Sequence, residues 1–137
     1  MKGVVIALIL LVGTPAWAQR ASEPVRLEGN EILISGLDHI GRRVTLTLCH
    51  VKGDAVFDPF CNIANQADRP LDRTIWTGFV MLDRRTLARD DFRKVLNDCP
   101  PMNKNDECWV SVEGTVRRYA SDRVVLERPV ITWGVRR

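Results

Sequence analysis

The stretch RRVTLTLCHV, residues 42–51, decides the fold that the sequence predicts. Val44, Leu46 and Leu48 alternate along it with threonine and cysteine, and this period of two is typical of a strand that buries one face. Its β-branched side chains also suit the pleated surface of a sheet. We therefore predict a strand over residues 42–51.

Four segments that follow this stretch carry a similar β-pattern, at residues 55–64, 74–82, 108–119 and 123–133. Pro59 and Pro129 predict an edge position or a bulge in the first and the last of them, because proline cannot donate to a sheet ladder. Gly114 predicts a bend or a bulge in the third. The turn over residues 120–122 joins the last two segments as a hairpin.

One segment, residues 86–98, has the spacing of a helix instead. Ala88, Phe92 and Val95 lie on one face, and the prolines that follow Cys99 end the pattern. The predicted order is therefore three strands, one helix and two strands. This is the order of the five-stranded OB (oligonucleotide/oligosaccharide-binding) barrel, an all-β fold with one helix. An α+β roll with an open sheet is the alternative.

Two short stretches carry a family resemblance. GRRVTLTL at residues 41–48 and CWVSVEGTV at residues 108–116 resemble the first and fourth strands of small exported bacterial OB-fold proteins, the tRNA-anticodon-binding-like group. The resemblance covers residues 36–133 as an architecture and implies the fold, without transferring any binding residue. Many members of that group have glycine in the first strand, where this chain has Leu48 and Cys49.

The N-terminal residues have the features of an export signal. Lys2 precedes an apolar run, residues 4–12, that is too short to cross a bilayer as a helix. Ala16 and Ala18 are the small residues that signal peptidase recognises. We expect a signal peptide over residues 1–18, an N-terminal lead-in over residues 19–35 and an OB-like domain over residues 36–137. The location is then periplasmic or secreted, without stable membrane insertion after cleavage.

Composition narrows the function classes. The 137 residues are 45% hydrophobic and 27% charged, which excludes a disordered or low-complexity chain. Removing Lys2 with the signal lowers the formal net charge from +3 to +2. A nucleic-acid binder needs a stronger, clustered positive charge, so nucleic acid is disfavoured as a partner.

The cysteine content predicts disulfides. An exported chain of this size with four cysteines is expected to form two bridges, whereas a zinc site that includes His50 is disfavoured by the wide cysteine spacings. We prefer the sequential pairing Cys49–Cys61 and Cys99–Cys108, because each closed loop lacks other anchors and closure stabilises it by roughly 3 kcal/mol. A crossed pairing that includes Cys49–Cys108 is the alternative, since the first and fourth barrel strands run antiparallel.

The sequence contains no established catalytic or cofactor motif, so we expect no enzyme, no cofactor and no metal site. Ser35, Asp38 and His39 could be taken as a hydrolytic set, but they fall in a predicted turn. Asp90 and Asp91 are adjacent on the predicted helix, where they diverge toward solvent. His50 is interpreted as a polar residue at a strand end.

Candidate binding residues come from the loops that border the usual ligand face of an OB barrel, residues 52–54 and 120–122. Arginine can bind carboxylate, sulfate or phosphate through two parallel hydrogen bonds, and an aromatic ring can stack on a ligand. The resulting set is Lys52, Trp76, Arg118, Tyr119 and Arg123. The competing interpretation places Trp76 in the core and makes the arginines solubilising residues of a hairpin. Trp109 and Trp133 are expected to cap the barrel.

The function predicted from these features is non-enzymatic. We expect a periplasmic OB-fold binding module for a small anionic or sugar-like ligand or for an envelope protein. One alternative is a secreted oligosaccharide-binding subunit of a multimeric assembly, similar to pentameric toxin B subunits. A small hydrolase is the other.

The export signal leads to a direct test. Signal peptidase is expected to cleave between Ala18 and Gln19, because both small residues then occupy the recognised positions. The intact mass of the exported protein should correspond to residues 19–137. A mass that includes residues 1–18 would contradict the prediction.

Overall fold

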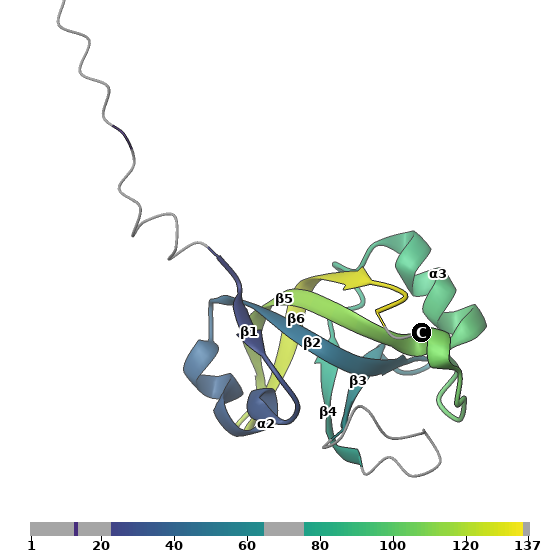
Figure 1. The fold of residues 1–137 in the computed structure, drawn as a ribbon, viewed down its shortest axis with the longest axis horizontal. Coiled ribbons are helices and arrows are strands. Elements are labelled where there is room, and N and C mark those ends of the chain that lie inside the picture. The colour runs from purple at the N-terminus through teal and green to yellow at the C-terminus, as the bar shows by residue number, and fades with distance from the viewer. Residues whose placement is uncertain (1–12, 14–22, 65–75, 136–137) are drawn as a thin grey trace, which may run out of the picture.

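The computed structural model describes residues 13, 23–64 and 76–135, without the side chains of residues 64, 76 and 77 (Figure 1). Five strands form the main body of the fold. They are β2 (Arg43–Lys52), β3 (Phe60–Ala64), β4 (Trp76–Leu82), β5 (Trp109–Ala120) and β6 (Arg123–Thr132). The predicted strands are thus present, in the predicted order.

The five strands close into a barrel. β2 pairs with β3 and β3 with β4, both antiparallel, and β4 pairs with β6 in parallel. β6 then pairs with β5, and β5 returns to β2, again antiparallel. Because β5 pairs with β2, the sheet has no open edge between them, and the open α+β roll is excluded. The chain forms the predicted OB-like barrel.

A bulge allows β5 and β6 to curve. The register of β5 against β6 shifts between Glu113 and Thr115, and Arg128 has a positive φ of 48°. A Cβ atom on Gly114 would lie 2.8 Å from the Cβ of Leu126, so glycine lets the strands approach here. The irregularities predicted from Gly114 and Pro129 therefore coincide in one bulge between β5 and β6.

β3 begins later than predicted. The carboxylate of Asp54 accepts hydrogen bonds from the backbone N–H groups of Val56 (2.8 Å) and Phe57 (2.7 Å). These bonds hold the residues before Pro59 in a turn, so strand pairing starts only at Phe60.

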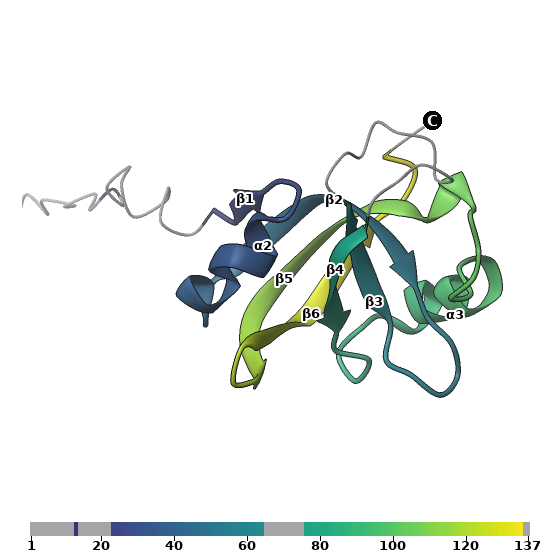
Figure 2. The same ribbon diagram turned by 90° about the horizontal axis from the view of Figure 1, so that it is seen from below.

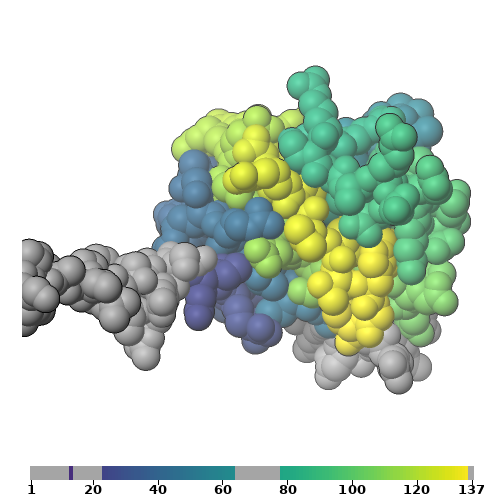
Figure 3. Space-filling view, turned by 90° about the horizontal axis from the view of Figure 1, so that it is seen from above, coloured from purple at the N-terminus to yellow at the C-terminus, as the bar shows by residue number. Residues whose placement is uncertain are grey.

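The helix α3 (Arg89–Asp98) lies between β4 and β5 in the chain and also starts later than predicted. The carboxylate of Asp83 accepts hydrogen bonds from the Arg85 N–H (3.2 Å) and the Thr86 hydroxyl (3.1 Å), which makes a turn before the helix. Val95 is the fully buried residue of α3 and packs against Gly53. Figure 3 shows α3 beside the C-terminal residues, and Trp133 donates a hydrogen bond to Asp91 there (3.0 Å).

The N-terminal lead-in adds structure to the outside of the barrel. β1 (Val25–Leu27) pairs in parallel with β2, and the short helix α2 (Glu31–Ser35) continues into a 3₁₀ turn, η1 (Gly36–His39). Figure 2 shows α2 beside the barrel strands. Two glycines allow this contact: a Cβ on Gly78 would lie 2.8 Å from Leu33, and a Cβ on Gly36 would lie 3.2 Å from Val124.

Both disulfides follow the sequential pairing, so that prediction is confirmed. Cys49 bonds to Cys61 with a Cα–Cα distance of 5.4 Å, and Cys99 bonds to Cys108 with 5.9 Å. The first bridge joins β2 to β3. The second closes the loop that contains the short 3₁₀ helix η3 (Asp106–Cys108) and ties the end of α3 to the start of β5.

Within the described residues, no helix has the length and apolar character needed to cross a membrane.

The second bridge should contribute strongly to stability. Replacing both Cys99 and Cys108 by alanine should lower the free energy of unfolding by about 3 kcal/mol, because the closed loop restricts the unfolded chain. Urea unfolding measures this change. Met102→Ala is the matched control, since Met102 lies in the same loop with 91% exposure and should have little effect. Equal stability of the double variant and the native chain would contradict the prediction.

Candidate functional site

Three adjoining hollows surround the outer side of β4, and we call this surface the β4 face. Figure 2 shows its setting, with α2 on one side, the β5–β6 hairpin beside it and the β2–β3 loop beyond β3. Met81 lines all three hollows, so they adjoin at this side chain. The face therefore offers one surface with three different linings.

The first hollow is the α2 groove, of about 450 Å³. α2 and η1 form one wall, the tip of the β5–β6 hairpin forms the other, and β4 lies between them. The groove is lined by Ile32, Leu33, Ile34, Gly36, Leu37, Phe79, Val80, Met81, Tyr119, Asp122, Arg123 and Val124. Its lining is mostly aliphatic, and its polar members all come from the hairpin.

The second hollow is the arginine cleft, of about 560 Å³. It lies between the turn that follows β4 and the outer side of β5, and is lined by Asp58, Met81, Asp83, Arg84, Arg85, Arg117, Tyr119 and Val125. It thus combines guanidinium donors, carboxylate acceptors and one phenol.

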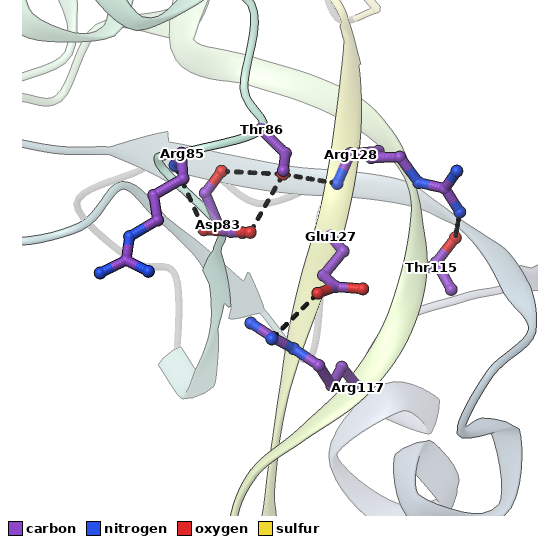
Figure 4. Close-up of polar contacts among 7 residues, drawn as sticks. All are labelled: Asp83, Arg85, Thr86, Thr115, Arg117, Glu127 and Arg128. Atoms are coloured by element: carbon purple, nitrogen blue, oxygen red, sulfur yellow. Dashed lines mark hydrogen bonds and ion pairs between the residues drawn. The ribbon is translucent and has the colours of Figure 1, made fainter.

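Neighbouring groups hold the arginines of this cleft to different degrees. Arg117 forms an ion pair with Glu127 at 3.0 Å, and the Arg84 guanidinium lies 4.7 Å from the Phe92 ring centre. Figure 4 shows the Arg85 side chain directed away from the Asp83 carboxylate, which instead accepts a hydrogen bond from its backbone N–H. Within the described part of the chain, no ion pair or hydrogen bond holds the Arg85 guanidinium.

The third hollow, the aromatic shelf, is small, with about 220 Å³. Phe60 and Phe79 meet edge to face on it, with 5.6 Å between ring centres. Phe57 is 65% exposed and Phe79 is 46% exposed, which leaves apolar ring surface facing solvent. The Arg123 guanidinium lies 5.7 Å from the Phe79 ring centre, where the shelf meets the α2 groove.

The structure brings two of the predicted binding residues together. Tyr119 lines both the α2 groove and the arginine cleft, and Arg123 lines the groove. Arg118 instead donates a hydrogen bond to the Ser121 carbonyl at 2.7 Å, across its own hairpin turn. Trp76 begins β4, opposite Ala64. Its side chain lies outside the described part of the structure, so the stacking role and the core role both stay predictions.

Lys52 lies apart from the other predicted binding residues. It ends β2 with 9% exposure and lines none of the three hollows. The next residue, Gly53, donates its N–H to the Cys99 carbonyl (3.0 Å), so the end of α3 covers this end of β2. Desolvation lowers the pKa of Lys52 from its usual value. Lys52 was assigned to an exposed binding loop, and this assignment is wrong because the end of α3 covers it.

His50 is buried on the side of β2 opposite its core neighbours Cys49 and Val51. Its ring is fully buried and meets Trp109 edge to face, with 5.1 Å between ring centres. Nε2 forms a hydrogen bond with the Asn105 carbonyl at 2.9 Å. His50 and Trp109 thus connect β2, the start of β5 and the disulfide-closed loop.

Three of the residues weighed for catalysis have structural partners. Ser35 donates its hydroxyl hydrogen to the Glu31 carbonyl, Asp90 lies 3.9 Å from Arg93, and Asp91 accepts the bond from Trp133. Among the described residues, no group of three or more His, Cys, Asp or Glu is placed to hold a metal ion. The polar and aromatic chemistry instead converges on the β4 face.

Several residues of this face were missed in the sequence. Phe60, Phe79 and Met81 alternate with the buried Cys61, Val80 and Leu82, so the period of two already places them on the outer side of their strands. Phe57 and Arg84 lie in turns whose position relative to the strands depends on barrel closure.

Comparison with models of known families, with curated proteins and with solved structures finds no match for this chain. The class of protein is therefore defined by its own structure, as an OB-like barrel with two disulfides and an aromatic and arginine-rich face. The resemblance to the tRNA-anticodon-binding-like group stays a prediction.

Burial of His50 predicts a pH-dependent stability. Desolvation lowers the pKa of His50 below its usual value of 6.5, a shift that the nearby Lys52 also favours, while Asn105 and Asp106 oppose it. The unfolded chain therefore binds a proton more readily than the folded one. Stability should be complete above about pH 6.5 and decline as the pH falls below it, by up to about 1.4 kcal/mol per pH unit.

Thermal unfolding from pH 8 to pH 5 measures this decline. The variant His50→Gln should have a shallower dependence than the native chain, whatever its stability at pH 8. Parallel pH profiles for the two proteins would show that His50 is not the group responsible for the decline.

Proposed function

We propose that this protein is a non-enzymatic, exported binding module whose β4 face binds a small sugar-like ligand that carries an acidic group. The observation that carries the proposal is the arginine cleft beside exposed aromatic rings. The proposal combines the anionic and the sugar-like ligands predicted from the sequence.

The lining of the arginine cleft suits a hydroxylated ligand. Sugar hydroxyls both donate and accept hydrogen bonds, and the cleft supplies guanidinium donors together with the Asp58 carboxylate and the Tyr119 hydroxyl. Its volume of about 560 Å³ falls within the range of small-molecule sites. The adjoining Phe57 and Phe79 rings offer apolar faces for the C–H surface of a sugar.

The arginines favour an acidic group on that ligand. Two of the three arginines that line the cleft, Arg84 and Arg85, form no ion pair among the described residues, and the Asp83 carboxylate already accepts bonds from Arg85 N–H and Thr86. A guanidinium binds a carboxylate through two parallel hydrogen bonds, which are stronger than neutral ones. Arg85 is the best candidate for this contact, because its side chain extends away from Asp83 (Figure 4).

Disulfides and the predicted signal peptide support a periplasmic or secreted location, since disulfides persist in oxidising compartments. The structural hydrogen bonds of Ser35 and Asp91 favour binding over hydrolysis, because both groups are already engaged.

Titration calorimetry with methyl β-D-glucuronide and methyl β-D-glucoside tests the proposal. The glucuronide should bind at least about tenfold more tightly, because only its carboxylate pairs with an arginine. Arg85→Gln should remove most of this difference and leave the melting temperature nearly unchanged, since Arg85 is exposed.

Arg118→Gln is the matched control, because Arg118 is an exposed arginine that lies outside the cleft. It should retain the affinity of the native chain. Absence of binding for both sugars, or equal glucuronide affinity of Arg85→Gln and the native chain, would overturn the proposal.

A further inference from the structure

The α2 groove and the arginine cleft are neighbours that differ in character. Met81 and Tyr119 line both, so the two hollows meet along these side chains. The cleft is polar and charged, whereas the groove is lined mainly by aliphatic residues of α2, η1 and β4. A ligand that filled both would need a polar end and an apolar end.

The groove is preformed by close packing of α2 on the barrel. The missing Cβ atom of Gly78 lets Leu33 approach β4, and that of Gly36 lets η1 approach Val124 of β6. Ile32 is buried by this contact, but Leu33 and Leu37 remain 38% and 37% exposed on the groove side. One wall of the groove is therefore apolar and exposed to solvent. This exposure is unfavourable in free energy unless a partner covers the wall.

The charges at the groove distinguish between its possible occupants. Arg123 stands at the junction of groove and shelf, and among the described residues its guanidinium forms no ion pair. Arg84 and Arg85 add two further guanidinium groups in the adjoining cleft, next to the carboxylates of Asp58 and Asp83. An occupant with a negative group next to an apolar chain complements this arrangement.

We propose that the ligand is a single amphiphilic molecule, with an acidic sugar in the arginine cleft and an aliphatic chain that crosses Met81 and Tyr119 into the α2 groove. This inference rests on the proposed function, because it assigns the sugar end to the same cleft. The groove is bounded by α2 on one side and by the hairpin on the other, and at about 450 Å³ it has the size of a small-molecule site. Its shape suits one chain better than a broad membrane or protein surface.

The test compares two probes that share one head group. Methyl β-D-glucuronide fills only the cleft, whereas octyl β-D-glucuronide, used below its micelle concentration, adds a chain for the groove. The octyl compound should bind the native protein at least about tenfold more tightly, because each buried methylene adds affinity. Octyl β-D-glucoside should bind more weakly than octyl β-D-glucuronide, since it lacks the acid.

Two matched variants locate the chain. Leu37→Trp places a larger side chain on the groove wall and should remove the gain from the octyl chain, while methyl β-D-glucuronide binds as before. Ile40→Trp is the control, because Ile40 is similarly exposed, at 43%, and lies just beyond η1 without lining the groove. It should keep the full gain.

The outcomes separate this inference from the proposed function. If methyl β-D-glucuronide binds and the octyl chain adds nothing, or adds as much in Leu37→Trp as in the native chain, the amphiphile is wrong and the sugar site stands. If neither compound binds, both proposals fail. A dimer in sedimentation velocity that Leu37→Trp abolishes would show that a second copy covers the groove, which also overturns the inference.

Discussion

The pairing of β2 with β5 is the constraint on which the rest of this structure depends. β5 occupies one edge of β2, and β1 and β3 share the other edge, beside residues 44–46 and 50–52. The pairing tolerates an irregularity between Leu46 and Cys49, where the Ser111 hydroxyl donates a hydrogen bond to the Leu46 carbonyl (3.0 Å). An ion pair between Arg43 and Glu113 (2.7 Å) lies along the same two strands. Without this closure β4 would be an ordinary inner strand of an open sheet, and its outer side would have different neighbours.

The candidate site is a consequence of what closure leaves uncovered. α3 and the disulfide-closed loop cover one end of β2 and exclude Lys52 and His50 from the surface. α2 covers part of the outer side of the barrel but stops short of the β5–β6 hairpin, which leaves the α2 groove. The Asp83 turn, stabilised by its own side-chain hydrogen bonds, directs the two following arginines toward the other side of β4. The same packing that stabilises the barrel thus arranges an apolar hollow next to a charged one.

The sequence predicted some residues of the candidate site correctly and others wrongly, and the physical reason differs from case to case. Tyr119 and Arg123 were found because a hairpin turn is visible in sequence, and both lie at its ends. Lys52 was assigned to an exposed loop because nothing local reveals that the end of α3, distant in sequence, lies over it. The outward side of Phe79 could have been deduced from the buried Val80, since neighbours in a strand face opposite ways. Phe57 could not, because its position depends on how a turn folds over the next strand.

The sequence by itself determined the five barrel strands, the helix α3, the bulge at Gly114 and Pro129, and the choice of disulfides within short loops. These features depend on periodicity, on backbone freedom and on loop closure, which act between residues close in the chain. Tertiary structure alone decided that Met81 and Tyr119 meet, that α2 docks through Gly36 and Gly78, and that arginines from two elements share one cleft. Those contacts join residues far apart in the chain, and they form only because the pairing of β5 with β2 bends the sheet into a closed barrel.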